Sequence, residues 1–273
     1  MSHAWQIAIR ELRMGLRNPW AYSFLALFVA FMLSLLLIQS QGYVQGYTGV
    51  TGTMLNLIIY LLPLMTLMLG SFSLTGERED GNWELLSAYP IRTWSWMLGK
   101  YVGLAVVLLV ICASGFGAAG LLGSLSGGGF ELSTYGLLLV FAGSLTLMFL
   151  AVALVVGTVA RNRWQALTIA VAIWFFAVIG WAPLLIGTLG MLPYMWIKPA
   201  VTVLTALNPA ELTRLFVVVK LGAGSVLGPE YYDWVRWIRG AAGTLGFAAL
   251  CALWIAVLGG GSAWLWERRR SRG

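Results

Sequence analysis

The sequence has few charged residues. Asp, Glu, Lys and Arg make up 10% of its 273 residues, whereas soluble domains carry about 25%. Hydrophobic residues make up 60%, and the mean hydropathy is +0.84. A chain with so little polar surface cannot cover an apolar core in water. This excludes a cytosolic enzyme, a secreted domain and a disordered linker, and it predicts an integral membrane protein.

Residues that bind metals or form disulfides are also scarce. The chain has one histidine, His3, and two cysteines, Cys112 and Cys251, which both lie in long apolar runs. We therefore expect two buried free thiols, and no metal site in this chain. Met191 and Met195 lie one helical turn apart, but methionine commonly fills gaps in apolar packing, so they do not predict a copper path.

A phosphate-binding loop is missing as well. Nucleotide motors need the pattern G-x-x-x-x-G-K-[ST]. The one Gly-Lys pair is Gly99-Lys100, with Trp94 in place of the first glycine and Tyr101 in place of Ser or Thr. Carriers driven by protons or sodium keep titratable groups inside the bundle, and the apolar runs hold none. The chain is predicted to be a non-catalytic subunit whose energy comes from a partner.

Long apolar runs are abundant. A helix needs about 20 apolar residues to cross the hydrocarbon layer. Six runs meet this length, which predicts an all-α, polytopic membrane protein with one transmembrane domain over 1–273. The predicted spans are 20–38, 54–75, 101–123, 134–160, 164–189 and 241–266. Gly99-x-x-x-Gly103 allows another helix to approach closely, although this pattern is common by chance.

The placement of basic residues predicts the orientation. Cytoplasmic loops of membrane proteins carry an excess of Lys and Arg. With the N-terminus inside, most of the basic residues fall on the cytoplasmic side, including the run 268–270, and the rest fall in one long outer loop, 190–240. The outer loop 124–133 has none. We therefore predict a protein of the cell (inner) membrane with both termini in the cytoplasm.

The segment 1–19, before the first span, is predicted to be an amphipathic helix. Trp5, Ile9, Leu12 and Leu16 share one helical face, and arginines flank it. Such a helix lies in the headgroup layer with its arginines reaching toward water. A plain, positively charged flank of the first span is the alternative.

The outer loop contains a second predicted helix. Residues 201–219 are apolar enough for a seventh span, but Glu211 and Arg214 would then lie in lipid at a cost of several kcal/mol. Asn208 is a good N-cap, and Gly222 can end the helix. We therefore predict an outer amphipathic helix on the outer surface. Its candidate residues for docking an outer partner are Asn208, Pro209, Glu211, Arg214 and Phe216.

A polar segment, 76–90, follows the second span. Glu77, Asp80 and Glu84 share one helical face in this segment. A short helix with a charged face and aromatic anchors suits a groove on a partner, and an ordinary solvated loop helix is the alternative. The apolar side chains that would act as anchors are Trp83, Leu86 and Tyr89.

This segment resembles a motif of ABC-2 type permeases. Residues 76–81 read GEREDG, followed by a Leu-Leu pair at 85–86 and by YPIR at 89–92. The resemblance covers essentially the whole chain, and 7–18 is similar to the elbow helix of that family. It implies a subunit that pairs with itself and with two cytoplasmic ATPases, which hold the ATP and Mg²⁺. By this likeness, the ATPase-coupling residues are Glu77, Arg78, Glu79, Asp80, Trp83, Glu84, Leu86, Tyr89, Arg161, Asn162 and Arg163.

The outer loop is similar to that of NosY-type permeases. The similarity lies in 207–215, which read LNPAELTRL, and in the Leu-Gly pairs at 221–222 and 227–228. It implies a NosF-like ATPase, an extracytoplasmic NosD-like partner and a role in copper-site maturation of nitrous oxide reductase. An ABC-2 exporter of a drug, lipid or peptide, and a passive membrane scaffold, are the alternatives.

Overall fold

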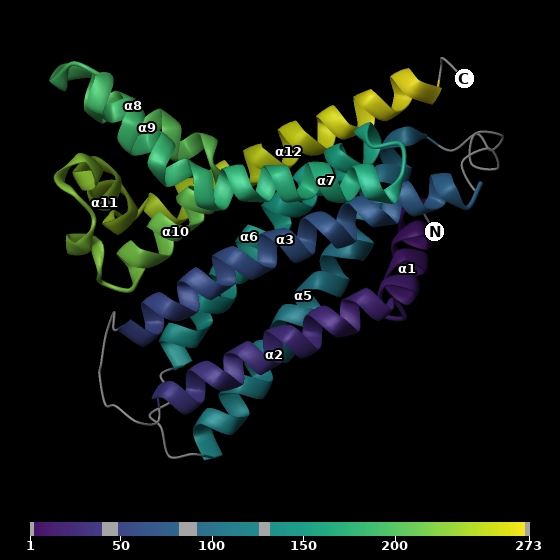
Figure 1. The fold of residues 1–273 in the computed structure, drawn as a ribbon, viewed down its shortest axis with the longest axis horizontal. Coiled ribbons are helices and arrows are strands. Elements are labelled where there is room, and N and C mark those ends of the chain that lie inside the picture. The colour runs from purple at the N-terminus through teal and green to yellow at the C-terminus, as the bar shows by residue number, and fades with distance from the viewer. Residues whose placement is uncertain (1–2, 40–48, 82–91, 126–131, 271–273) are drawn as a thin grey trace.

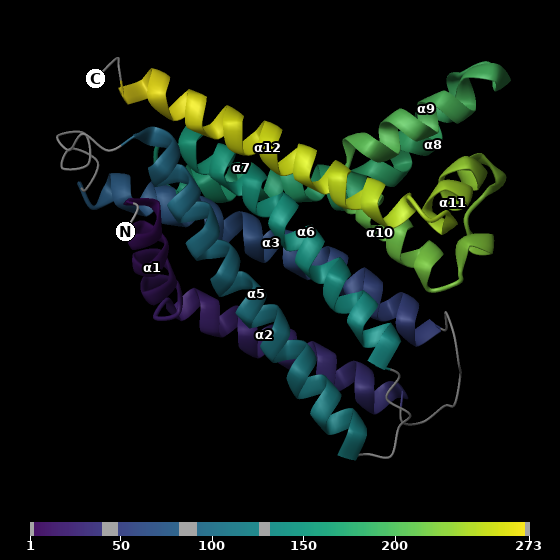
Figure 2. The same cartoon turned by 180° about the vertical axis from the view of Figure 1, so that it is seen from behind.

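The computed structural model describes residues 3–39, 49–81, 92–125 and 132–270. Within these ranges most of the chain is helical and no strand forms, which confirms the predicted all-α fold. Long helices lie alongside one another, and both ends of the chain lie at one end of the bundle (Figures 1 and 2). We call this the termini end. Helices α8 to α11 lie at the opposite, or far, end.

The long helices coincide with the predicted spans. By length and composition, five of the described helices can cross a membrane, and the number reaches seven if each of two bent helix pairs is one span. The six predicted spans agree with this range. The fifth is divided by a turn of π-helix. The helices are α2 (Pro19–Gln39), α3 (Gly49–Glu79), α5 (Thr93–Leu125), α6 (Leu132–Val159), α7 (Arg163–Trp174), η1 (Phe175–Gly180), α8 (Trp181–Met191) and α12 (Gly243–Arg270).

Helix α6 lies at the centre of the packing, in contact with α3, α5, α10 and α12. Small residues bring α3 and α6 close together. A Cβ on Gly70 would lie 2.6 Å from the Cβ of Ala153, and a Cβ on Gly157 would lie 2.8 Å from the Cβ of Leu74. Glycines at such contacts let two helix backbones approach closely inside a membrane.

The spans differ in how much of their apolar surface the chain itself covers. In α3 and α6, 61% of the apolar stretch is buried, whereas in α7–α8 and in α12 the fraction is 11%. Lipid or another protein must cover the apolar side chains of these two spans, because water cannot solvate a face of this length.

The predicted N-terminal helix is α1 (His3–Gly15), which turns by 65° into α2. It crosses α5 at the Gly99-x-x-x-Gly103 pattern. A Cβ on Gly99 would lie 2.6 Å from the carbonyl oxygen of Ala4, and a Cβ on Gly103 would lie 2.7 Å from that of Ala8. The pattern therefore positions α1 on α5.

The face of α1 that packs only partly matches the predicted apolar stripe. Ala8 and Glu11 are buried and Leu12 of the stripe packs against the core, whereas Trp5 and Leu16 of the stripe are exposed. Close packing on the glycines of α5 favours small side chains at the crossing. The two exposed residues of the stripe are free to enter the headgroup layer, as the amphipathic pattern predicts.

The far end holds α9 (Tyr194–Leu207), α10 (Pro209–Lys220), η2 (Gly224–Val226), η3 (Pro229–Tyr231) and α11 (Tyr232–Arg239). The predicted outer helix is confirmed as α10. The Asn208 side chain accepts a hydrogen bond from the backbone N–H of Ala210 at 2.9 Å, and Gly222 has the left-handed φ of +83° that often ends a helix. Helix α9, which the sequence analysis did not predict, meets α10 at 107°.

One expectation for α10 is wrong. The helix does not lie on a surface but contacts α6, α9, α11 and α12, and most of its residues are buried. The physical reason is its apolar run at 215–219, which extends around the whole helix. A helix that is apolar all round is buried.

Both cysteines are free thiols, as predicted. Cys112 on α5 is buried, and Cys251 on α12 is half-buried.

Candidate functional site

The last turn of α3 carries the first of the predicted coupling residues. The helix continues to Glu79, and Gly81 follows with a left-handed φ of +71°. Glycine adopts this conformation easily, and it commonly stands just after a helix end. The first residues of the polar segment 76–90 therefore continue the second span as its last turn. The remaining coupling residues of this segment lie in 82–91, outside the described residues; they are Trp83, Glu84, Leu86 and Tyr89.

Lys100 forms the centre of a buried ionic cluster. Its side chain is 0% exposed, and Nζ lies 2.9 Å from Oε1 of Glu11 and 3.2 Å from Oε1 of Glu77. Nζ also donates to Oγ of Ser73 at 2.7 Å, and that hydroxyl donates to Oε2 of Glu11 at 2.9 Å. Arg10 lies 3.2 Å from Glu77. The cluster joins α1, α3 and α5.

The cluster corrects the expected position of Glu77. We predicted its side chain on a polar face directed at a partner, but it is buried and pairs with Lys100. A buried charge is stable only when it is paired, so Glu77 and Lys100 depend on each other. The pair was not predicted, because Lys100 directly precedes the apolar run 101–123 and so was expected at the edge of a span. The Gly99-x-x-x-Gly103 pattern was an available signal, since it indicates a close helix beside Lys100.

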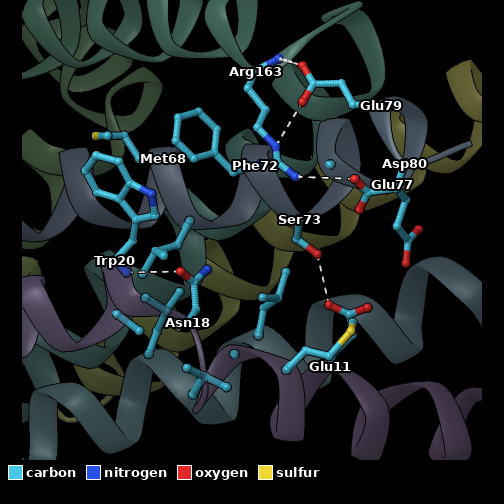
Figure 3. Close-up of a pocket in the computed structure, with 18 of the residues that line it drawn as sticks. Glu11, Asn18, Trp20, Met68, Phe72, Ser73, Glu77, Glu79, Asp80 and Arg163 are labelled. Carbon is cyan, nitrogen blue, oxygen red and sulfur yellow. Dashed lines mark hydrogen bonds and ion pairs between the residues drawn. The ribbon is translucent and has the colours of Figure 1, made fainter. Parts of the chain in front are cut away.

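A second ion pair joins the two predicted coupling segments. Nε of Arg163 lies 3.0 Å from Oε2 of Glu79, and the backbone N–H of Arg163 donates to Oε1 at 2.8 Å. The guanidinium also lies 3.9 Å from Asp80. Figure 3 shows these contacts beside Glu77. Arg163 and Asp80 are exposed, so this junction can be reached from outside the chain.

Arg78 connects the end of α3 to the end of α6. Its guanidinium donates to the carbonyl oxygens of Ala160 at 2.5 Å and Thr158 at 3.1 Å. The last carbonyls of a helix lack partners within the helix and carry partial negative charge, so a cation is favourable there. Asn162 then caps α7 by accepting from the backbone N–H of Gln165 at 2.8 Å. Arg161 is exposed on the same turn.

A cleft of about 720 Å³ lies beside this junction. Its walls come from α1, the start of α2, the last turns of α3, and parts of α5 and α7. Figure 3 shows Glu11, Ser73 and Asn18 on one side of it and Arg163 with Glu79 on the other. The lining is charged near the end of α3 and apolar farther along the helices.

The predicted outer docking residues lie at the far end. Arg214 is the most exposed of them, and it holds Glu211 through two hydrogen bonds of 3.1 and 2.8 Å. Burial raises the pKa of the neighbouring Tyr231 phenol, and the Glu211 carboxylate acts in the same direction. Docking through this helix stays a prediction. The buried members of the set are Asn208, Pro209, Glu211 and Phe216.

Asn208 makes a further contact that the sequence did not indicate. Its Nδ2 donates to the carbonyl oxygen of Ala177 at 2.7 Å. Ala177 belongs to the π-helical turn η1 that divides the fifth span. Turns of this kind are often found at functional sites. One side chain thus caps α10 and holds the irregular turn of a neighbouring span.

The chain matches the model of a known family, ABC-2 family transporter proteins, over residues 5–269. It is also similar to two proteins named probable ABC transporter permease protein NosY. The one from Stutzerimonas stutzeri is 30% identical over 237 residues, which cover 84% of this chain and 86% of the relative. The one from Pseudomonas aeruginosa is 30% identical over 224 residues, which cover 79% and 81%.

Proposed function

Because the chain belongs to the ABC-2 family of transporter proteins, we propose that it couples ATP hydrolysis by a separate cytoplasmic ATPase to an event on the outer face of the membrane. It is a multi-pass membrane permease. In this proposal it works as a homodimer in the cell (inner) membrane with both termini in the cytoplasm. The partner ATPase, which is NosF-like, binds the ATP and Mg²⁺, and this chain holds neither.

The observation that carries the proposal is the contact between Glu79 and Arg163. It connects the end of α3 to the start of α7, the two places where the family resemblance puts the coupling segments. Arg78 adds a link to α6, and the Glu77–Lys100 pair adds a link to α1 and α5. A displacement at either segment is therefore passed to five helices through ion pairs and hydrogen bonds.

We further propose that the outer event is copper-site maturation of nitrous oxide reductase, through an extracytoplasmic NosD-like partner. The similarity to the two NosY proteins supports this assignment. The contact of Asn208 with η1 supplies a route from a span to α10 at the far end. The mechanism is mechanical: ATP biases two arrangements of the helices, and the far end moves against its docked partner.

A charge exchange tests the coupling. Glu230 is exposed at the far end. In a background with Cys112→Ala and Cys251→Ala, the variant Glu230→Cys places a single cysteine there. The rate at which a maleimide labels this cysteine reports on the conformation of the far end. In the complex with the ATPase, we expect ATP to change this rate. Glu79→Arg or Arg163→Glu alone should remove the ATP response, and both together should restore it.

Two results would count against this proposal. If each single exchange keeps the ATP response, the pair is not the coupling junction. If the protein with Glu79 and Arg163 unchanged shows no change in labelling rate on adding ATP, then the chain is a passive scaffold.

Tagged purification tests the partners. Recovery with an ATPase, at two copies of each chain, together with an outer NosD-like protein supports copper-site maturation. Recovery of the ATPase without that outer protein supports an exporter of a drug, lipid or peptide, and recovery of this chain alone supports the scaffold.

A further inference from the structure

The cleft beside the coupling junction opens at the depth where lipid head groups lie. Its lining includes Trp20 at the start of α2 and Trp164 at the start of α7, which are 53% and 78% exposed. Tryptophan is enriched at membrane–water interfaces because one part of its ring is apolar and one part binds water. The two rings therefore place this cleft at the boundary between lipid and water.

The lining changes from charged to apolar along the direction of the helices. Glu79 and Glu77 line one end, near the end of α3, and Phe72 and Met68 follow on the same helix. Asp80 and Met68 are separated by roughly 18 Å of helix, at about 1.5 Å per residue. Half of the hydrocarbon layer measures about 15 Å. The cleft thus has the polarity and the length of one lipid molecule that stands in the inner half of a bilayer.

The charged end offers partners for both signs. The guanidinium groups of Arg10 and Arg163 are partly exposed and suit a phosphate, which guanidinium binds through paired hydrogen bonds. Asp80 is 61% exposed and suits an ammonium group. Four carboxylates line the cleft: Glu11, Glu77, Glu79 and Asp80. Three cations lie against them, the two guanidinium groups and the buried ammonium group of Lys100. The one negative charge in excess disfavours a head group that carries a phosphate but no amine.

Glu77 fixes the position of one of these guanidinium groups. Its side chain is buried, it pairs with Lys100, and it lies 3.2 Å from the guanidinium of Arg10. Arg10 itself is 43% exposed. The buried carboxylate therefore holds the Arg10 guanidinium at the charged end of the cleft, where a phosphate can reach it.

We propose that this cleft binds one phosphatidylethanolamine molecule. Arg10 and Arg163 hold its phosphate, the carboxylate of Asp80 faces its ammonium group, and an acyl chain lies along Phe72. The site does not depend on the proposed coupling, because lipid binding is measured on this chain without its ATPase.

Native mass spectrometry of the purified full chain tests the site. The probe is an equimolar mixture of dioleoyl phosphatidylethanolamine and dioleoyl phosphatidylglycerol. We expect one retained phosphatidylethanolamine per chain. Leu167 lines the apolar part of the cleft, so Leu167→Trp fills it and should lower this occupancy by about tenfold or more. Leu253→Trp is the matched control on α12, where the side chain is exposed outside the cleft, and it should keep the lipid.

A second pair of variants tests the head group. Asp80→Asn should lower the preference for phosphatidylethanolamine over phosphatidylglycerol by about fivefold, because it removes a carboxylate from the ammonium site. Asp233→Asn is matched to it, since Asp233 is 62% exposed and also lies 3.9 Å from a basic residue, but at the far end. It should leave the preference unchanged.

Four results would overturn the proposal. They are the absence of retained lipid, equal retention of the two lipids, equal loss from both tryptophan variants, and release of the lipid whenever the ATPase is bound. The last result would assign the cleft to a protein partner.

Discussion

The buried charge of Lys100 is expected to contribute strongly to the stability of the fold. Its ammonium group has two carboxylates as partners, those of Glu11 and Glu77, and no exposure to solvent. We predict that Lys100→Met lowers the free energy of unfolding by about 3–5 kcal/mol, because Glu11 is left buried without a cation and Glu77 keeps only the half-exposed Arg10. Thermal melting of the detergent-purified protein measures the loss. Lys198→Met is the control, since Lys198 is exposed and lies 3.9 Å from Asp233; its melting temperature should not change.

The same cluster allows a stricter check of that cause. Lys100→Met combined with Glu11→Gln and Glu77→Gln replaces the ammonium group and both of its carboxylate partners by neutral side chains. This triple variant should melt at a higher temperature than Lys100→Met alone, because neutral amides cost less to bury than unpaired carboxylates. A triple variant that melts no higher than Lys100→Met would show that the loss comes from packing and not from charge.

At the level of residues, the sequence predicted which segments matter but not which side chains meet. Glu79 and Arg163 were both expected in coupling segments, from the family resemblance. Their contact joins positions 84 apart in the chain, and no local pattern specifies such a pairing. Glu77 was assigned to a partner-facing surface for the same reason, because helical periodicity describes a face but not what covers it.

At the level of elements, the position of α1 depends on two glycines of α5. A Cβ on Gly103 would lie 2.6 Å from the Cβ of Glu11. We predict that Gly103→Val displaces α1 from α5, so the amide hydrogens of residues 4–15 exchange faster with solvent. Hydrogen–deuterium exchange of the purified protein measures this change.

Gly117 provides the matched control for that prediction. It lies on the same helix, and a Cβ there would meet nothing within 4 Å. Gly117→Val introduces the same β-branched side chain into α5, so it carries the same propensity cost. Exchange in residues 4–15 should match the parent protein. Equal acceleration in both variants would mean that α5 itself is weakened and that α1 does not depend on the close approach.

The junction of α9, α10 and η1 depends on Asn208. Asn208→Ala removes the cap at Ala210 and the hydrogen bond to Ala177, so we predict a loss of about 1–3 kcal/mol. Asn208→Ser keeps a capping hydroxyl but is too short to reach η1. This variant should lose only the part of the stability that comes from the hydrogen bond to Ala177. If Ser restores the full melting temperature, the contact with η1 contributes nothing measurable to stability.

Helix α10 also separates what local sequence predicts from what it does not. Asn208, Pro209 and Gly222 specify its start and end through backbone hydrogen bonds and φ, which depend on neighbouring residues alone. Its burial depends on α6, α9 and α12, which lie far away in the sequence. Helix α9 was missed because its residues continue an apolar run without a clear boundary, and Pro199 stands inside it.

At the scale of the whole molecule, the uneven covering of the spans supports a paired arrangement. The apolar stretches of α3 and α6 are mostly buried inside one chain, whereas those of α7–α8 and α12 are mostly exposed. The proposed homodimer would cover part of this exposed surface, and lipid would cover the remainder. A charged cluster at one end and irregular helices at the other then give the molecule two different faces toward water.

The assignment of these two faces follows from charge and can be tested directly. Arginines are concentrated at the termini end, and positive charge is retained on the cytoplasmic side, so we predict that this end is cytoplasmic. In a background with Cys112→Ala and Cys251→Ala, we introduce Gln6→Cys at the termini end or Glu230→Cys at the far end. Both parent side chains are exposed.

A membrane-impermeant maleimide should label right-side-out vesicles at Glu230→Cys only, and inside-out vesicles at Gln6→Cys only. The pair of results matters more than either alone, because the number of spans between the two positions decides whether they share a side. If α9 and α10 together formed a seventh span before residue 230, as one of the bent pairs allows, both positions would react from the same side. Opposite labelling therefore requires an odd number of crossings between Gln6 and Glu230, as the five predicted spans before residue 190 give, with α9 and α10 held at the outer face.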